Sequence, residues 1–329
     1  MHFTVSVLIP VHNARLYISR CLDSIIKQDY EHKQIVIIDD GSTDDSFEIC
    51  QSYASKYPFV SVYTREHKGI VQTRKELIEY ARGEYVLFID SDDWIEDNML
   101  GDLIRLIVDY DADIAMCGLR YGDRPIYPMS LNMNSKITEF DREETILSLL
   151  NYGGLMNSLC NKLIKETYYK GLRYQEDVSI GEDLYMMWQI IPKINKVVCT
   201  PALYYHYENI TGSLTRRSET INLKTACNLW LILERESHIY LSEYTVLLKR
   251  RTFFEIASYS YLLVKQNTPS REVVRELIKS MKIRFPYFQF KSRLELLKIL
   301  WCTIGIVGGP KLLKLASRLY NLLRKNYNH

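Results

Sequence analysis

The chain has 329 residues, with 42 basic and 40 acidic side chains and a net charge of +2. It is 47% hydrophobic and 25% charged, an ordinary globular composition that excludes intrinsic disorder, collagen-like repeats and low-complexity sequence. Its length predicts two domains, or one α/β domain with a large addition. The charge is unevenly spread, because residues 281–329 hold ten basic side chains and one acidic side chain.

The first 117 residues alternate between short apolar runs and stretches in which apolar side chains recur at helical spacing. We expect strands at residues 5–10, 33–38, 59–63, 85–89 and 114–117. We expect helices at residues 14–28, 43–57, 70–81 and 96–110. Near-continuous apolar strands separated by helices predict a mostly parallel, Rossmann-like sheet with helices on both faces, which is an α/β fold.

The second part of the chain is less regular. Residues 118–141 have no clear period, and helical spacing returns at residues 143–150, 155–168 and 182–191. Two short strands are expected at residues 197–199 and 202–207, and nearly everything from residue 221 onward has helical spacing. We therefore expect one domain over residues 1–220, with halves 1–117 and 118–220, and then a mainly helical region over residues 221–329.

Polar clusters follow four of the predicted strands. They occupy residues 10–13, 39–42, 65–69 and 90–93. Each cluster alone is ordinary turn or helix-cap chemistry. Because function in an open α/β sheet gathers at the carboxyl ends of the strands, four such clusters in succession predict a binding site at that edge.

The run Asp90-Ser91-Asp92-Asp93 is the sharpest of these clusters. Three carboxylates this close repel one another unless a cation or hydrogen-bond donors compensate them. Mg²⁺ and Mn²⁺ prefer such oxygens and commonly bridge to substrate phosphates. Capping of the next helix accounts for one carboxylate at most. The chain has neither a P-loop nor a dinucleotide-binding glycine motif, so a metal and side chains would hold any phosphates.

Three segments together, residues 5–13, 37–44 and 88–93, closely resemble the family 2 glycosyltransferases with the GT-A fold. The resemblance covers roughly residues 4–215. It implies that Pro10, Val11 and Asn13 at the end of the first strand bind a nucleotide sugar together with Asp39 and Asp40. It further implies that Asp90, Ser91 and Asp92 form a DxD motif, in which Asp90 and Ser91 contact the nucleotide sugar and Asp92 and Asp90 bind Mn²⁺ or Mg²⁺.

Residues 67–75 resemble a further segment that the family usually carries. Gly69 and Arg74 match its pattern, which implies that both contact the nucleotide sugar. His67, Thr73 and Lys75 depart from the pattern, which leaves the role of His67 open.

The resemblance also supplies a candidate catalytic base. Glu182 and Asp183 resemble the family's Glu-Asp motif, which implies that Asp183 removes the acceptor's proton while Glu182 orients the base or the acceptor. Inverting sugar transfer needs such a base opposite the leaving diphosphate. Without the resemblance, the same two residues are equally consistent with a pair of acidic side chains at a helix N-terminus.

The aromatic run at residues 204–207 resembles the family's closing segment. His206 is there a candidate third metal or phosphate ligand, with a packed core histidine as the alternative. Glu208 stands where the resemblance leads us to expect Arg. Arg216 and Arg217 are candidates to neutralise the leaving diphosphate, with a solvated surface pair as the alternative.

The C-terminal residues 311–325 carry leucines on one helical face and basic side chains elsewhere. This pattern predicts a basic amphipathic helix at an anionic membrane surface, with a helix packed on the domain or a homodimer contact as alternatives. No nucleic-acid motif accompanies the basic residues. The seven cysteines form no Cys-x-x-Cys pair, and neither a signal peptide nor a long apolar stretch is visible. We expect a cytoplasmic protein, peripheral on the inner face of the cell membrane.

Together these features predict an inverting, metal-dependent glycosyltransferase that moves a sugar from a UDP-sugar donor to a glycan. The resemblance implies a lipid-linked or oligosaccharide acceptor in bacterial surface polysaccharide synthesis, such as capsule, exopolysaccharide or O-antigen. The alternatives are a nucleotidyltransferase and a non-catalytic glycan-assembly protein on a transferase scaffold.

Overall fold

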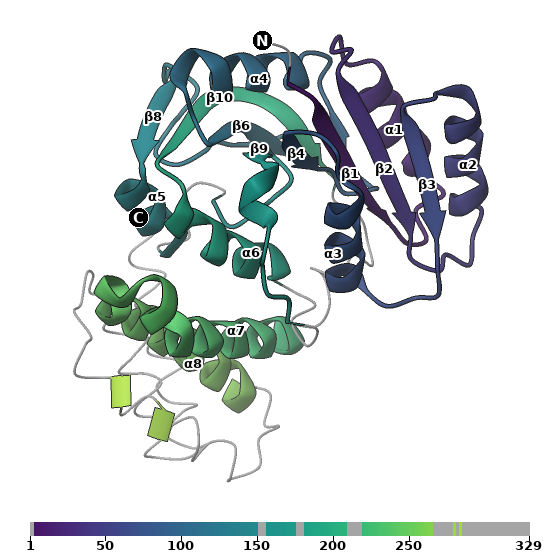
Figure 1. The fold of residues 1–329 in the computed structure, drawn as a ribbon. Helices are drawn as coiled ribbons and strands as arrows, with labels where there is room; N and C mark the ends of the chain where they lie inside the picture. The colour runs from purple at the N-terminus through teal and green to yellow at the C-terminus, as the bar shows by residue number, and fades with distance from the viewer. Residues whose placement is uncertain are drawn as a thin grey trace. The chain divides into compact units, whose positions relative to one another are not determined.

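The computed structural model describes residues 3–150, 156–175, 181–208, 219–265, 279–280 and 283–284. The chain divides into two compact units, residues 1–212 and residues 213–329. The first unit has an α/β fold, in which helices cover both faces of an open sheet of parallel and antiparallel strands. The described part of the second unit is helical (Figure 1). This arrangement confirms the expected fold class.

Four parallel strands form one side of the sheet, in the order β3-β2-β1-β4. They are β1 (Val5–Val11), β2 (Lys33–Asp39), β3 (Val60–Thr64) and β4 (Tyr85–Phe88). The helices that connect them are α1 (Ile18–Ile26), α2 (Ser46–Lys56) and α3 (Ile70–Tyr80). Val11 pairs with Asp39, and Asp39 pairs with Thr64, so these three strands end at the same level.

The sheet continues from β4 through β9, β6 and β10 to β5. These strands are β5 (Trp94–Ile95), β6 (Ile114–Tyr121), β9 (Lys162–Lys165) and β10 (Lys196–Tyr207). β7 (Arg124–Ile126) pairs with β6, and β8 (Thr138–Asp141) pairs with β10. The helices of this half are α4 (Met99–Tyr110), α5 (Arg142–Leu150) and α6 (Glu182–Ile190), with 3₁₀ turns η1 (Glu166–Tyr169) and η2 (Ile191–Lys193).

The buried strands supply side chains to both faces of the sheet. Val5, Val7 and Ile9 of β1 belong to the core cluster formed with α1 and α4. Leu8 and Val36 are equally buried but lie outside that cluster, on the face that α3 covers. Figure 1 shows α3 and α6 on the opposite side of the sheet from α4. Alternation with period two therefore builds two apolar layers from one near-continuous apolar run.

Three sequence-based expectations about local structure are wrong. The predicted helix at 155–168 is instead a turn, strand β9 and η1 in its described part, residues 156–168. The two strands expected near residues 197–207 are one strand, β10, with irregular register opposite Cys199 and Leu203. The region 118–141 contains the end of β6 as well as β7 and β8, which are too short for a visible period.

The second unit contains α7 (Glu219–Tyr240), the 3₁₀ turn η4 (Ser242–Tyr244) and α8 (Thr245–Lys265). Trp230 and Phe253 are buried, and Arg284 forms an ion pair with Glu234 at 2.6 Å. The predicted basic amphipathic helix at 311–325, together with Arg216 and Arg217, lies outside the described residues. Among the described residues, no helix has the length and apolar character required to cross a membrane.

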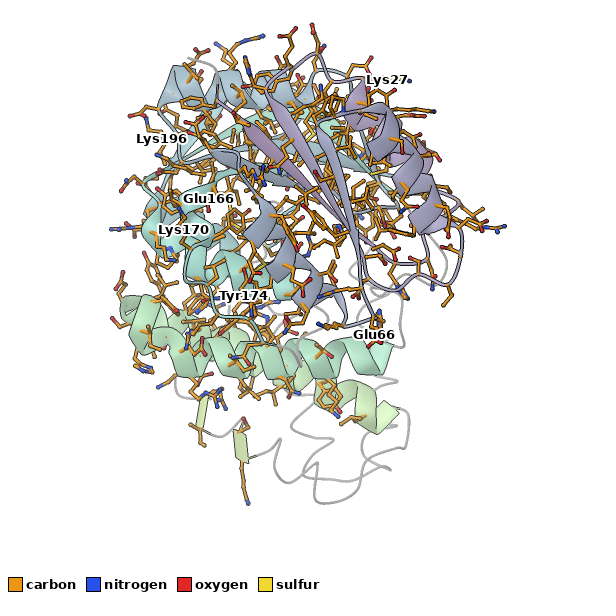
Figure 2. The ribbon with its side chains drawn as sticks, turned by 45° about the vertical axis from the view of Figure 1, so that its right-hand side comes forward. Lys27, Glu66, Glu166, Lys170, Tyr174 and Lys196 are labelled. Atoms are coloured by element: carbon orange, nitrogen blue, oxygen red, sulfur yellow. The ribbon has the colours of Figure 1, made fainter. Side chains whose placement is uncertain are left out.

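Charged side chains such as Lys27, Glu66 and Lys170 are exposed on the first unit, where Lys170 pairs with Glu166 at 3.2 Å (Figure 2). The cysteines of the described residues are all buried and free. Buried thiols of this kind are packing residues.

Candidate active site

The carboxyl ends of the parallel strands bring the predicted polar clusters to one edge of the sheet. Pro10 and Val11 are buried in the last positions of β1. The carbonyl oxygen of Val11 accepts a hydrogen bond from the backbone N–H of Asp40 at 2.8 Å. Asp39 and Asp40 thus lie beside the end of β1.

Asp39 is 1% exposed and only partly hydrogen-bonded. Its Oδ2 accepts hydrogen bonds from the backbone of Ser42 at 3.1 Å and from Thr64 Oγ1 at 3.2 Å. Its Oδ1 is buried and has no hydrogen-bond partner among the described residues. A buried carboxylate oxygen is costly unless a donor reaches it, so this atom is well suited to accept a hydrogen bond from a ligand.

Asp40 is fully engaged by the protein itself. Its carboxylate accepts hydrogen bonds from the backbone of Lys68 at 2.9 Å and of Gly69 at 2.7 Å, and it pairs with Arg65 at 2.9 Å and His67 at 3.0 Å. Burial alone would raise the pKa of Asp40, but these partners hold the pKa below its ordinary value. Asp40 therefore anchors the loop that precedes α3 and fixes Gly69, which begins that helix with φ of +88°.

Asn13 shapes the neighbouring loop. It has φ of +52°, and its Oδ1 accepts a hydrogen bond from the backbone of Thr43 at 2.8 Å. Its own backbone N–H donates to Ser42 Oγ at 2.9 Å. His12 and His67 stack with ring centres 4.4 Å apart at the same edge. The positive φ suits Asn, which tolerates this conformation better than most residues.

The three carboxylates that follow β4 separate into two kinds. Asp93 is 1% exposed and accepts hydrogen bonds from the Tyr205 hydroxyl at 2.5 Å and the backbone of Glu208 at 2.8 Å. It therefore fastens the end of β10 to this loop. Ser91 lies in the turn that the Asp93 N–H closes onto the Asp90 carbonyl at 3.0 Å. Asp90, by contrast, turns its carboxylate to the Arg74 guanidinium at 3.1 Å.

Burial first, and then the charge of Asp90, raises the pKa of Asp92 to about 6. Crowding of this kind is relieved by a cation, and carboxylate oxygens are the ligands that Mg²⁺ and Mn²⁺ prefer. The donor chemistry of Asp90 and Asp92 therefore fits a divalent metal. Within the described part of the chain, no three His, Cys, Asp or Glu side chains are grouped so as to hold a metal ion.

His206 lies apart from the two predicted carboxylate ligands. Its ring stacks on Trp94 with centres 3.5 Å apart, and its Nε2 is 2.6 Å from Glu96 Oε1. The strand alternation places Tyr205 toward Asp93 and the next residue toward the other face. The structure thus does not bring His206 to Asp90 and Asp92, and its packed, hydrogen-bonded environment matches the alternative considered for it.

Arg20 of α1 contacts the loop of residues 90–93. This contact was not predicted from the sequence. The Arg20 guanidinium is 2.9 Å from Glu208 Oε1 and donates to the carbonyl oxygen of Asp92 at 3.2 Å. Glu208 also accepts a hydrogen bond from Trp94 Nε1 at 3.1 Å. Position 208 could have indicated Arg20. It carries Glu where Arg is expected, and a carboxylate there predicts that another element supplies the positive charge.

Glu182 and Asp183 occupy the first turn of α6, next to a guanidinium from α3. Arg74 Nη2 is 3.1 Å from Asp90 Oδ1 and 3.3 Å from Asp183 Oδ1, and its Nε is 3.5 Å from Glu182 Oε1. Asp183 Oδ2 also accepts a hydrogen bond from the backbone of Leu159 at 3.1 Å. The structure thus links the predicted base to the predicted donor-side carboxylate through one side chain.

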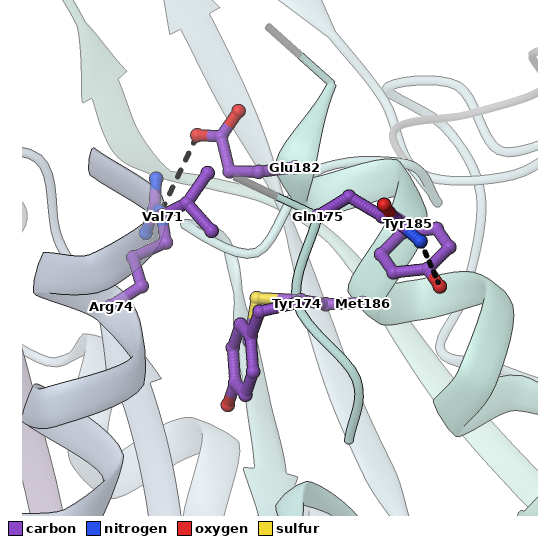
Figure 3. A pocket seen from close by; sticks show the side chains of 7 residues that line it. All are labelled: Val71, Arg74, Tyr174, Gln175, Glu182, Tyr185 and Met186. Carbon is purple, nitrogen blue, oxygen red and sulfur yellow. Dashed lines mark hydrogen bonds and ion pairs between the residues drawn. The ribbon is translucent and has the colours of Figure 1, made fainter. Parts of the chain in front are cut away.

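Burial, followed by the charge of Asp183, raises the pKa of Glu182 to about 8. Burial also raises the pKa of Asp183, while Arg74 opposes that rise. A carboxyl with a raised pKa is suited to general acid or base work near neutral pH. Arg74 and Glu182 line a small pocket together with Tyr174, Gln175 and Tyr185, which Figure 3 shows from close by.

The Asn161-Lys162 segment holds the backbone that contacts Asp183. Lys162 is fully buried, and its Nζ donates to Asn161 Oδ1 at 2.8 Å and to the carbonyl oxygen of Ser158. Burial lowers the pKa of Lys162 to about 8. Asn161 Nδ2 in turn donates to the carbonyl oxygen of Cys117 at 2.5 Å. These bonds fix residues 158–161, which include the Leu159 N–H that holds Asp183.

Comparison with known proteins identifies relatives of this chain. The family model described as "Glycosyl transferase family 2" matches residues 6–173. "Glycosyltransferase GlyA" of Streptococcus pneumoniae is 31% identical over 220 residues, and "Minor teichoic acid biosynthesis protein GgaB" of Bacillus subtilis is 27% identical over 214 residues. These alignments cover 64% and 63% of this chain, but only 31% and 23% of the two relatives.

Among solved structures, residues 1–349 of TarS from Staphylococcus aureus have a similar fold. The TM-score is 0.71 at 17% sequence identity, and the match covers 97% of this chain and 91% of that one. A mannosyltransferase from Pyrobaculum calidifontis, solved with GDP-Man and Mn²⁺, gives a TM-score of 0.54 at 14% identity, covering 97% of this chain and 87% of that one.

Proposed function

The chain belongs to glycosyl transferase family 2, whose model matches more than half of its residues, and on this premise we propose that it transfers a sugar from a UDP-sugar to a glycan acceptor with inversion at the anomeric carbon. The observation that carries the proposal is the link between Asp90 and Asp183 through Arg74, at the edge of the sheet where β2 ends in Asp39. Asp39 offers a buried free oxygen.

The donor side of the proposed site is the edge formed by β1, β2 and β4. Asp39 Oδ1 is placed to accept a hydrogen bond from the nucleoside, and Pro10, Val11 and Asn13 would form the wall beside it. Asp40 and Gly69 would act on the nucleotide sugar indirectly, since the Asp40 carboxylate is hydrogen-bonded to the loop before α3. TarS, which has a similar fold, has been solved in complex with UDP-GlcNAc, which supports a uridine nucleotide.

Asp90 and Asp92 are the residues that would hold Mn²⁺ or Mg²⁺. A bound divalent cation would neutralise the diphosphate and so stabilise it as a leaving group. Ser91 would contact the nucleotide sugar between these two side chains. Arg20, beside the Asp92 carbonyl, adds a positive charge at the rim of the same loop.

The acceptor side is formed by the first turn of α6. Asp183 would take the proton from an acceptor hydroxyl as that oxygen attacks the anomeric carbon, while the bond from this carbon to the diphosphate breaks. The proton ends on Asp183 and the electron pair leaves with UDP. Burial and the charge of Asp183 raise the pKa of Glu182, and its protonated form would donate a hydrogen bond that orients the acceptor or the base.

The acceptor is proposed to be a lipid-linked or oligosaccharide glycan of bacterial surface polysaccharide synthesis. GgaB, which is named for teichoic acid biosynthesis, supports this class. The eight basic side chains of residues 285–329, which lie in and before the predicted amphipathic helix, suit an anionic membrane surface at the cytoplasmic face. Such a tail would bring the transferase to a lipid-linked acceptor.

A panel of UDP-sugars tests the proposal. The full-length chain is incubated with Mn²⁺ and each UDP-sugar, with and without oligosaccharide acceptors, and UDP release and product mass are measured. We expect UDP release with one or a few donors. Pyrophosphate release from a nucleoside triphosphate would instead identify a nucleotidyltransferase, and binding of donors without turnover would identify a non-catalytic protein.

A further inference from the structure

Arg74 of α3 lies between the two groups of carboxylates that the proposed reaction uses. It touches Asp90 on the donor side and both Glu182 and Asp183 on the acceptor side, at 3.1–3.5 Å. The side chain is 3% exposed, and its guanidinium carbon lies 5.0 Å from the centre of the Phe88 ring. A single buried cation therefore contacts both halves of the site.

The chemistry of the guanidinium suits this location. It is planar, permanently charged and carries five N–H donors in fixed directions, so that it can hold several carboxylates at set angles. Lysine has one point charge on a flexible stem and cannot reproduce this arrangement. Removing this cation would leave three half-buried acidic side chains without the ion-pair partner that they share.

The guanidinium is not saturated by these contacts. Its Nε and Nη1 have no hydrogen-bond partner among the described residues, although both atoms are buried. Asp183 Oδ1 likewise accepts no hydrogen bond there, although it lies 3.3 Å from Nη2. Hydrogen bonds in catalytic sites are often long without substrate and tighten when the reacting complex forms. The free donors and acceptor are what such tightening requires.

We propose that Arg74 is a positioning residue, which fixes Asp183 relative to Asp90 so that the acceptor hydroxyl and the donor's anomeric carbon meet in line. The inference rests on the proposed function, in which Asp90 faces the donor and Asp183 takes the acceptor's proton. It differs from the expectation that Arg74 contacts the nucleotide, because here the guanidinium acts through carboxylates. Arg74 itself neither gains nor loses a proton during the reaction.

Kinetics and nucleotide binding of Arg74 variants test the inference. In the full-length chain, UDP release from the preferred donor is measured with water or glycan as acceptor, and UDP binding is measured by calorimetry. We expect Arg74→Met to lower kcat at least about a hundredfold, since misplacing a reacting group by about 1 Å has this effect. The donor KM and the Kd for UDP should stay within about threefold of the original values.

Two further variants separate positioning from stability. Arg74→Lys keeps the charge and is expected to recover about tenfold of the kcat lost in Arg74→Met, because the ammonium can reach only part of the carboxylate set. Arg251→Met is the matched control. Arg251 belongs to the second unit, where it pairs with Glu255 and lies 5.3 Å from the Trp230 ring. Its kcat should equal that of the original chain.

Several outcomes would overturn the inference. One is an Arg74→Met variant with unchanged kcat, and another is a loss of about tenfold or more in UDP affinity with kcat retained, which would make Arg74 a nucleotide contact. If Arg74→Met does not fold by thermal melting, Arg74→Lys decides, and equality of its kcat with the original rejects the inference. If the original chain releases no UDP from any donor, the proposed function itself fails.

Discussion

Asp39 and Asp40 are neighbours in the sequence but have opposite relations to the protein. Asp40 is bound by two backbone N–H groups and by Arg65 and His67. Asp39 keeps a buried oxygen free. Sequence alone could place both at a strand end, because the apolar run of β2 stops there. It could not tell them apart, because the partners of Asp40 come from 25 to 29 residues further along the chain.

Asp40→Ala is predicted to lower the free energy of unfolding by about 3–5 kcal/mol, because it removes one of the two carboxylates paired with Arg65 and the acceptor of the Lys68 and Gly69 backbone N–H groups. The folded-state pKa of Asp40 is lowered, so its stabilisation is complete above about pH 4, the ordinary Asp value, and is lost as the pH falls through the folded-state value. Urea unfolding at neutral and acidic pH measures both effects.

The matched control is Asp45→Ala, which breaks an ion pair between two exposed side chains, Arg15 and Asp45. This variant should lose about 0–1 kcal/mol. Equal losses for Asp40→Ala and Asp45→Ala would contradict the anchoring role of Asp40.

Gly41 tests how closely the loop after β2 approaches the loop before α3. It has φ of +69°, and a Cβ added there would lie 2.7 Å from the backbone nitrogen of His67. Gly41→Ala is therefore predicted to lower the free energy of unfolding by about 3 kcal/mol. Gly122 also has a positive φ, of +56°, but no atom within 4 Å of such a Cβ.

Gly122→Ala should therefore cost only the conformational strain, about 1 kcal/mol. Comparison of the two variants by chemical denaturation isolates the steric contact. If the loss in Gly41→Ala does not exceed that in Gly122→Ala, the two loops are not in contact as described.

At the scale of elements, the alternating strands and helices of the first half could be predicted, because long buried runs separated by helical spacing leave little choice of fold. The segment around β9 could not. Met156, Leu159, Cys160, Leu163 and Ile164 recur at helical spacing and are all buried. They form a turn and an interior strand, because β9 pairs with both β4 and β6. Asn161 also bonds to Cys117, 44 residues away. Such distant partners override local period.

The end of β10 is joined to α1 by the ion pair between Arg20 and Glu208. The single charge reversals Arg20→Glu and Glu208→Arg are each predicted to raise the Kd for UDP in the presence of Mn²⁺ by about tenfold, because they release the loop that carries Asp92. The double reversal should recover at least half of that loss in free energy.

Calorimetry of the four proteins provides the cycle. Stability should change little, by about 0–1 kcal/mol, since both side chains are partly exposed. Strictly additive losses in the double variant would show that the two side chains do not act as a pair.

At the scale of the whole molecule, the near-neutral charge is an average over different regions. Residues 1–280 hold seven more acidic than basic side chains, and residues 281–329 hold nine more basic than acidic ones. Arg284, one of the basic residues of this second region, is 9% exposed and paired with Glu234. A basic residue near the tail can thus serve packing, which charge counts alone cannot reveal.

The remaining tail is predicted to bind anionic membranes. Sedimentation with vesicles that contain about one third anionic lipid should bring down the full-length chain at low salt and release it at high salt, because each basic side chain contributes about 1 kcal/mol that salt screens. A chain truncated after residue 284 should stay in solution. Equal binding of both chains would contradict the assignment of membrane contact to the tail.

The catalytic account depends most on two carboxylates, Asp92 and Asp183. Their proposed roles predict that Asp92→Asn and Asp183→Asn each lower kcat for UDP release at least about a hundredfold while thermal melting stays near the original. Asp109→Asn, an exposed change on α4, is the control and should keep full activity.

The most direct measurement is therefore UDP release from the preferred UDP-sugar by the original chain, Asp183→Asn and Asp109→Asn, under identical conditions with Mn²⁺. The account predicts turnover by the original chain and by Asp109→Asn, and loss of about 99% or more of it in a folded Asp183→Asn variant. Full turnover by Asp183→Asn would contradict the assignment of the base and with it the proposed mechanism.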